Sequence, residues 1–144
     1  MYAVNTQHRE EIMANHLHHV QIFASDVEKS IRFYQDIFGG RVLMDTEISG
    51  ARNILMRIGN GRLVIYDQPP KDSGRGSIHH FAIQTDDLEG NVERMKRKGI
   101  AFKKDIADNG YIKYIMVPAP DNILVEYFEV NKAMLPEEYA EFFE

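Results

Sequence analysis

The sequence contains a histidine doublet twice, as LHHVQI at residues 17–22 and as IHHFAI at residues 78–83. Each doublet is followed by an acidic stretch typical of a helix start, Ser25–Glu28 in the first case and Asp86–Glu89 in the second. When the two stretches are aligned 61 positions apart, both histidines, an isoleucine, an aspartate and a glutamate match. The chain is therefore predicted to contain two copies of one structural unit.

The alternation of side chains along a strand selects one histidine from each doublet. In the predicted strand 17–24 the apolar residues share a face with His18, which leaves His19 on the opposite face. The same parity selects His80 in the strand that opens with Ile78. Because the apolar face of each strand is expected to pack on the following helix, His19 and His80 are predicted to face a shared cavity.

Each unit is predicted to read strand, helix, strand, strand, strand, which makes the fold class α+β. Ser25 and Glu28 predict a capping box for the first helix, and Gly39-Gly40 predicts its end. The other expected elements are strands 41–47, 52–58 and 62–67, a helix over 87–98, and strands 101–104, 111–117 and 123–130.

The predicted organisation is a leader, a single domain and a tail. The leader covers residues 1–16, and the domain covers 17–130, with module one at 17–67, a linker rich in Pro, Gly and Ser at 68–77 and module two at 78–130. The tail, residues 131–144, is expected to open a short helix at Pro136 whose aromatic residues cover the core or a partner subunit.

Composition excludes several classes of protein. The formal charge is 17 − 22 = −5, which gives no electrostatic support to a nucleic acid or an acidic membrane as partner. The chain has no cysteine, so disulfides, zinc-thiolate clusters and thiol nucleophiles are excluded. Residues 1–15 lack the apolar run of a signal peptide and no segment is long enough to span a bilayer, so a cytoplasmic protein is expected.

A third candidate metal ligand lies in the last strand. Glu126 stands within the apolar stretch 123–130, where an unpaired carboxylate would be costly to bury. It should therefore be bound to a cation, a hydrogen-bond donor or a metal. Two imidazoles and a carboxylate, from His19, His80 and Glu126, form a donor set suited to a divalent ion.

This arrangement resembles the vicinal oxygen chelate superfamily over residues 17 to about 130. The group includes glyoxalase I, methylmalonyl-CoA epimerase, fosfomycin-resistance transferases, extradiol dioxygenases and bleomycin-binding proteins. The resemblance implies two βαβββ modules in tandem that form a curved mixed sheet with a central cup. It also implies one divalent metal (Zn, Ni, Mn, Co or Fe(II)) on His19, His80 and Glu126, a small-molecule substrate and a homodimer. Asn122 stands where this family usually has glycine in the turn before Glu126, and asparagine tolerates a positive φ.

The branches of this family differ in the fourth ligand. Glyoxalase I enzymes carry a carboxylate on the last strand of module one, but here the centre of that strand, residues 63–68, has no metal-binding oxygen. Asp67 and Gln68 would reach the site only if the strand register were later. A three-ligand site with open positions for water and substrate is therefore expected.

The predicted strands carry candidate catalytic and substrate-binding residues. The proton-transfer candidates are Glu126, as a displaced ligand, and Tyr114 or Tyr66. The residues that could contact substrate are Arg52, Arg57, Lys113 and Gln21, although a solvated position at the sheet edge is the favoured interpretation of each cation.

Three function classes stay open at this point. The first is a metal-dependent lyase, isomerase or transferase of the glyoxalase kind, which chelates two substrate oxygens on the metal. The second is an Fe(II)-dependent dioxygenase. The third is a non-catalytic protein that binds a small molecule such as an antibiotic, and the intact set of three ligands counts against it.

Overall fold

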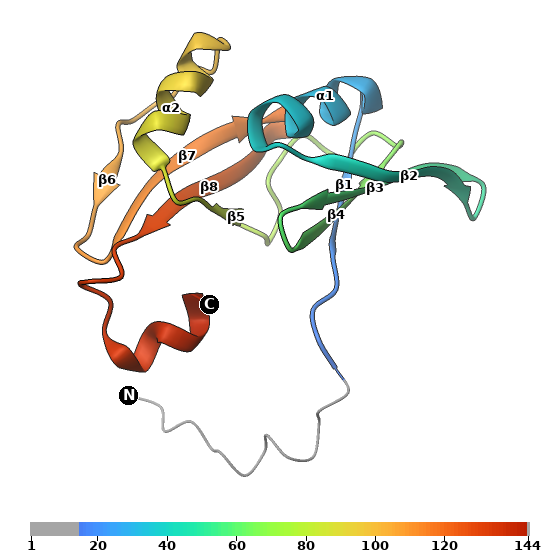
Figure 1. Ribbon diagram of the computed structural model, residues 1–144. Coiled ribbons are helices and arrows are strands. Elements are labelled where there is room, and N and C mark those ends of the chain that lie inside the picture. The colour runs from blue at the N-terminus through green and yellow to red at the C-terminus, as the bar shows by residue number, and fades with distance from the viewer. Residues whose placement is uncertain (1–14, 144) are drawn as a thin grey trace.

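The computed structural model describes residues 15–143, which form two similar units side by side (Figure 1). The predicted leader lies outside the described residues except for Asn15 and His16. The first unit contains β1 (Val20–Phe23), α1 (Val27–Phe38), β2 (Arg41–Ile48), β3 (Ala51–Ile58) and β4 (Gly61–Tyr66). The second contains β5 (Phe81–Gln84), α2 (Leu88–Arg97), β6 (Ala107–Asp108), β7 (Ile112–Ala119) and β8 (Ile123–Val130). Two 3₁₀ segments complete the chain, η2 (Pro120–Asn122) and η3 (Glu137–Phe143).

Each unit holds a four-stranded mixed sheet, with the order β1-β4-β3-β2 in the first and β5-β8-β7-β6 in the second. The first strand runs parallel to the last strand of its own unit, and the other pairs are antiparallel. The predicted α+β fold with tandem βαβββ modules is therefore confirmed. Because each sheet uses only strands of its own module, β1 and β5 are both edge strands.

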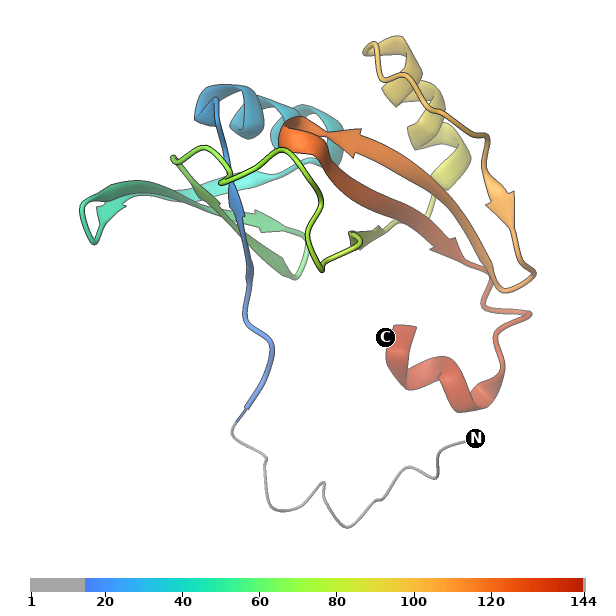
Figure 2. The same cartoon turned by 180° about the vertical axis from the view of Figure 1, so that it is seen from behind.

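The two helices lie on the same side of the sheets, and η3 lies on the opposite side (Figures 1 and 2). We call the side of each sheet that carries no helix its open face. The helix-bearing faces form two hydrophobic cores, one under each helix. Five partly buried residues pack against both cores and so join the modules, namely Phe33, Phe38, Phe81, Ala119 and Ile123. Among residues 15–143, neither α1, α2 nor any other helix is long and apolar enough to cross a bilayer.

The start of α1 differs from the predicted capping box. Asp26 is the N-cap, and its Oδ1 accepts a hydrogen bond from the backbone N–H of Lys29 at 3.1 Å. Ser25 instead donates its hydroxyl and its backbone N–H to the carboxylate of Asp121 in the second module. The prediction was off by one residue because Ser and Asp are both good caps, and only the tertiary contact decides between them.

Several predicted strand boundaries were also wrong. Strand β6 lies at Ala107–Asp108 instead of 101–104, because the turn at Asn109-Gly110 fixes the pairing of β6 with β7. Strands β1 and β5 begin only at Val20 and Phe81, where pairing with β4 and β8 begins. Both histidine doublets therefore lie immediately before their strands.

Helix α1 is bound at both ends by the second module. The carboxylate of Asp121 accepts from Ser25 N at 3.2 Å, next to the helix N-terminus. At the C-terminal end, Arg94 of α2 donates to the carbonyls of Asp36 and Ile37 at 2.7 and 2.6 Å. An anion at the N-terminus and a cation at the C-terminus of a helix are each favoured by the helix dipole.

Replacing Arg94 tests this attachment. Arg94→Ala should lower the free energy of unfolding by about 2 kcal/mol, because charge-assisted hydrogen bonds to two terminal carbonyls are lost. Equilibrium urea unfolding measures the change, with Arg97→Ala on the exposed side of the same helix as the matched control. Equal effects of the two substitutions would show that the contact does not hold the modules together.

Tyr34 of α1 gives a second test of the core. Its side chain is fully buried, and its hydroxyl has no hydrogen-bond partner among the described residues. Burial, with a smaller effect of the Asp121 charge, raises the pKa of Tyr34. Tyr34→Phe should raise the free energy of unfolding by about 1 kcal/mol, because it removes an unsatisfied buried group.

The pH dependence of this difference has a definite sign. Since the folded-state pKa of Tyr34 is raised, wild type loses stability as the pH rises above the ordinary tyrosine value of about 10. The advantage of Tyr34→Phe should therefore grow in that range, measured by urea unfolding at pH 7 and at alkaline pH. Tyr139→Phe, at a more exposed tyrosine, is the control, and a variant less stable than wild type at both pH values would contradict the interpretation.

Candidate functional site

His80 and Glu126 form a close pair on the open face of the second sheet. Strands β5 and β8 place Ala82 beside Glu126, and His80 lies two residues before Ala82 on the same face. The ring Nε2 of His80 donates to Oε2 of Glu126 at 2.8 Å, and both side chains are partly exposed. The predicted need of Glu126 for a partner is met by this imidazole.

This pair adjoins a cleft of about 210 Å³, which we call the smaller cleft. His80 lines it together with β1, Ile78 and the turn that contains Asp121 and Asn122. Asn122 has a φ of +59°, so asparagine does supply the left-handed conformation in place of glycine. The smaller cleft therefore lies between the two modules, at the start of β8.

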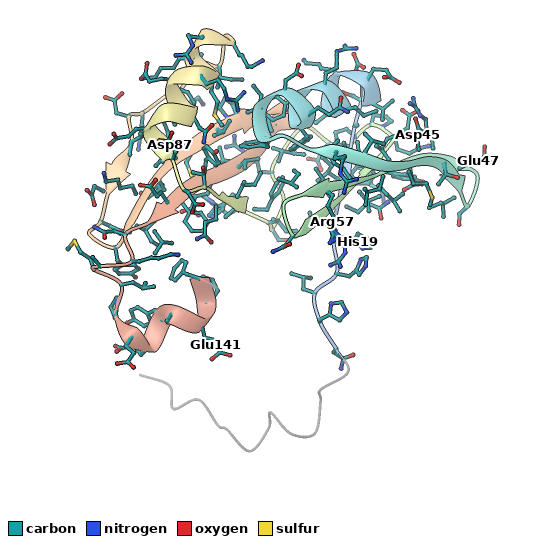
Figure 3. The ribbon with its side chains drawn as sticks, in the orientation of Figure 1. His19, Asp45, Glu47, Arg57, Asp87 and Glu141 are labelled. Carbon is teal, nitrogen blue, oxygen red and sulfur yellow. The ribbon has the colours of Figure 1, made fainter. Side chains whose placement is uncertain are left out.

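His19 occupies the corresponding position in the first module but lies in a different cleft. It lines a cavity of about 900 Å³, the larger cleft, formed by the C-terminal end of α1, the turn Gly59–Gly61 and β5. Its Nδ1 lies 3.0 Å from Nδ1 of His18, and the Nδ1 atoms of His79 and His80 are 2.7 Å apart in the same way. Figure 3 shows His19 at the lower edge of the first sheet, on the segment that leads into β1.

The structure brings together two of the three predicted ligands. Within residues 15–143, no group of three His, Asp or Glu side chains is placed to hold a metal ion. His80 and Glu126 are 2.8 Å apart and fit a metal's imidazole and carboxylate donors, whereas His19 of the same chain does not join them. A complete set of the three predicted ligands would need a His19 from another copy of the chain.

The equivalent of Glu126 in module one is Val64. Gln21 pairs with Val64 across β1 and β4, as Ala82 pairs with Glu126 across β5 and β8. Asp67 and Gln68 lie beyond the end of β4 at Tyr66. The register thus supplies no carboxylate from module one at the position that Glu126 holds in module two.

Arg52 and Lys113, two of the predicted substrate contacts, lie on the helix-bearing faces. Arg52 forms ion pairs with Glu28 of α1 and with Asp45, both at 2.8 Å, and its hydrogen bond lowers the pKa of the Asp45 carboxyl. Lys113 Nζ lies 3.5 Å from Oε1 of Glu89 in α2. Strand parity therefore turns both cations away from the face that carries Glu126.

Gln21, Arg57 and Tyr114 lie on the open faces. Gln21 donates from Nε2 to Oδ1 of Asn53 at 3.3 Å, and Arg57 lies opposite Arg62 in the next strand. Tyr114 is two residues before Met116, the residue paired with Glu126, and so shares its face. Tyr66 pairs with Asn53 and so shares the open face of the first sheet. These four candidates from the sequence therefore remain on the side of the histidines and Glu126.

The sequence patterns missed the tail as part of the larger cleft. Phe143 of η3 packs against Phe128, on the open face of β8, with ring centroids 6.1 Å apart, and it lines the larger cleft. Tyr139 packs against Tyr111 at 5.9 Å. Arg62 was also missed as a site residue. Strand alternation could have found it, because Arg62 pairs with Arg57 across the turn between β3 and β4.

The family model described as Glyoxalase/Bleomycin resistance protein/Dioxygenase superfamily matches residues 16–127. The chain belongs to this superfamily. Mouse (Mus musculus) mitochondrial methylmalonyl-CoA epimerase is 27% identical over 105 residues, which cover 65% of this chain and 59% of that protein.

Solved structures of the superfamily fold resemble the chain over most of its length. The antibiotic binding protein TnmS3 from Streptomyces sp. CB03234 matches with a TM-score of 0.72 and 21% identity, covering 83% of this chain and 99% of that one. The fosfomycin resistance protein FosX from Listeria monocytogenes, complexed with Mn(II) and sulfate ion, matches with a TM-score of 0.66 and 21% identity, covering 85% and 98%. These likenesses concern the fold, and they include both a metal-bound protein and a ligand-binding protein.

Proposed function

We propose that the protein is a metal-dependent enzyme, a lyase, isomerase or transferase that chelates two oxygens of a small substrate on one divalent ion. The observation that carries the proposal is the His80–Glu126 pair at 2.8 Å on the open face, beside a cleft. The Mn(II) complex of FosX, a protein of the same fold, supports it. The chain's own residues do not distinguish Zn, Ni, Mn, Co and Fe(II) as the ion.

The third ligand in this proposal is His19 of the partner subunit in a homodimer. One described chain provides only two of the three donors in one place. His19 and His80 each precede an edge strand, and a two-fold axis could bring β1 of one copy to β5 of the other in both directions at once.

The residues beside the doublets support such an interface. Leu17 and Ile78, which immediately precede the two histidine doublets, are 90% and 71% exposed. Large apolar side chains that flank polar site residues are typical of surfaces covered by a partner. A second copy would bury both apolar residues and complete both sites.

The chemistry is divided between the ion and the protein. When bound, the ion would act as a Lewis acid that stabilises negative charge on the substrate oxygens. Glu126 would hold its carboxylate toward the ion and the substrate, and the ion would take the place of the hydrogen bond that Nε2 of His80 donates to it in the structure. Tyr114, on the same face of β7, is the candidate for giving or accepting a proton at its hydroxyl.

Metal binding by single variants tests the ligand set. His19→Ala, His80→Ala and Glu126→Ala should each weaken binding of Mn(II) or Zn(II) at least about tenfold, because even outer-sphere partners of a metal commonly contribute that much. Metal content and titration calorimetry on protein without a histidine tag give the measurement. His16→Ala, at an exposed histidine outside the proposed set, is the control. Unchanged affinity in the three variants would leave a non-catalytic binding protein, as the likeness to TnmS3 suggests, as the better interpretation.

Mixing variants tests whether the site lies between subunits. If His19 of one copy completes the site of the other, a dimer of His19→Ala with Glu126→Ala carries one doubly altered site and one intact site. After random exchange of subunits, about a quarter of all sites should regain tight metal binding. If each site were built within one chain, no sites would regain tight metal binding. Each variant alone should also bind metal only weakly in the same assay.

A further inference from the structure

Three arginines lie in a row across the open face of the first sheet. Arg41 of β2 pairs with Arg57 of β3, and Arg57 pairs with Arg62 of β4. Residues paired on neighbouring strands point to the same face with Cβ atoms roughly 5 Å apart. Three guanidinium groups therefore gather at one end of this sheet, close to where His18 and His19 precede β1.

None of these arginines has an ion-pair partner in the part of the chain that the structure describes. The ion pairs found there use other cations, such as Arg52, Lys96 and Lys113. The carboxylates of β2, Asp45 and Glu47, pair with Ile54 and Arg52 and so point to the helix-bearing face. The strands of this sheet therefore place only positive charge on its open face.

The larger cleft reaches this row at Arg62, the one member of the row that lines it. Arg62, His18 and His19 line it, and so does one carboxylate, Asp86, which forms no ion pair with Arg62. The cleft volume of about 900 Å³ lies within the range of pockets that bind small organic molecules.

Like charges placed opposite each other on neighbouring strands destabilise a sheet. Such a row is costly in the free protein, and the cost is removed when an anion lies across it. The guanidinium group donates two parallel hydrogen bonds to phosphate oxygens and keeps its charge at any physiological pH. Three such groups match the charge of a phosphate ester or diphosphate better than that of a single carboxylate.

We propose that Arg41, Arg57 and Arg62 form a binding site for a phosphate group, a monoester or diphosphate, carried by the small molecule that occupies the larger cleft. This inference deepens the proposed function, on which it rests for the role of the bound molecule as substrate. In the proposed dimer, the arginine row beside the partner's His19 would hold the phosphate, and the metal on His80, Glu126 and the partner's His19 would hold the pair of oxygens.

The test measures anion binding by metal-free protein, so that pyrophosphate cannot act through a bound ion. Inorganic pyrophosphate and phosphate should bind in titration calorimetry and raise the melting temperature at constant ionic strength, whereas acetate should not. Arg57→Ala and Arg41→Ala should weaken pyrophosphate binding at least tenfold, and Arg57→Lys should be intermediate because lysine lacks the planar fork. Arg32→Ala, at an exposed arginine of α1, is the control of equal charge.

Two outcomes would overturn the proposal. One is equal pyrophosphate affinity in wild type and both alanine variants, and the other is equal affinity of wild type for acetate and pyrophosphate. Arg41 is exposed, so Arg41→Ala keeps the test valid if Arg57→Ala does not fold. His80→Ala and Glu126→Ala should bind pyrophosphate as wild type does, because the row lies wholly in module one. A failed metal site with intact anion binding would therefore count against the proposed enzyme and leave the phosphate site standing.

Discussion

The two ends of helix α1 carry the contacts on which the arrangement of the modules depends. A carboxylate from the turn before β8 accepts hydrogen bonds at the N-terminal end, and a guanidinium from α2 donates to the last carbonyls. Both contacts agree in sign with the helix dipole, so neither charge competes with the other. Between them, aromatic residues such as Phe38 and Tyr127 pack edge to face across the two cores. The helix of one module is thus bound by charges and rings of the other.

This attachment has a consequence for the site. With the modules joined on the helix side, the outer edges of β1 and β5 have no strand partner within residues 15–143, and the open faces stay accessible. Each histidine doublet lies at the start of one of these edges, where the chain enters the sheet. His80 meets Glu126 within its own module, whereas His19 has only Val64 at the corresponding position. One module therefore holds a paired imidazole and carboxylate, and the other presents an imidazole with no carboxylate opposite it.

Much of the fold could be predicted because the repeat and the strand alternation depend only on local sequence. The open-face positions of His80 and Glu126 followed from parity, and the bounds of β8 agreed with prediction. Arg52 and Lys113 were also within reach of parity, since the alternation in their own strands assigns both to the helix-bearing side. The cap at Asp26 depended on a contact between distant residues, Ser25 and Asp121, which no local pattern contains. The position of His19 relative to Glu126 is of the same kind.

Charge in the first sheet is separated by face, and the separation follows from the alternation of a few residues. In β2 the sequence Asp45-Thr46-Glu47 sends both carboxylates to one face, where Arg52 bridges Asp45 to Glu28 of α1. A shift of β2 by one residue would have placed both carboxylates on the face of Arg57, where they could form ordinary surface ion pairs with it. Because they lie on the helix side instead, the arginines of the open face have no ion-pair partner within residues 15–143, although the whole chain carries a charge of −5. A positive face on an acidic protein favours anions at that face, and this is the electrostatic basis of the proposed phosphate site beside His19.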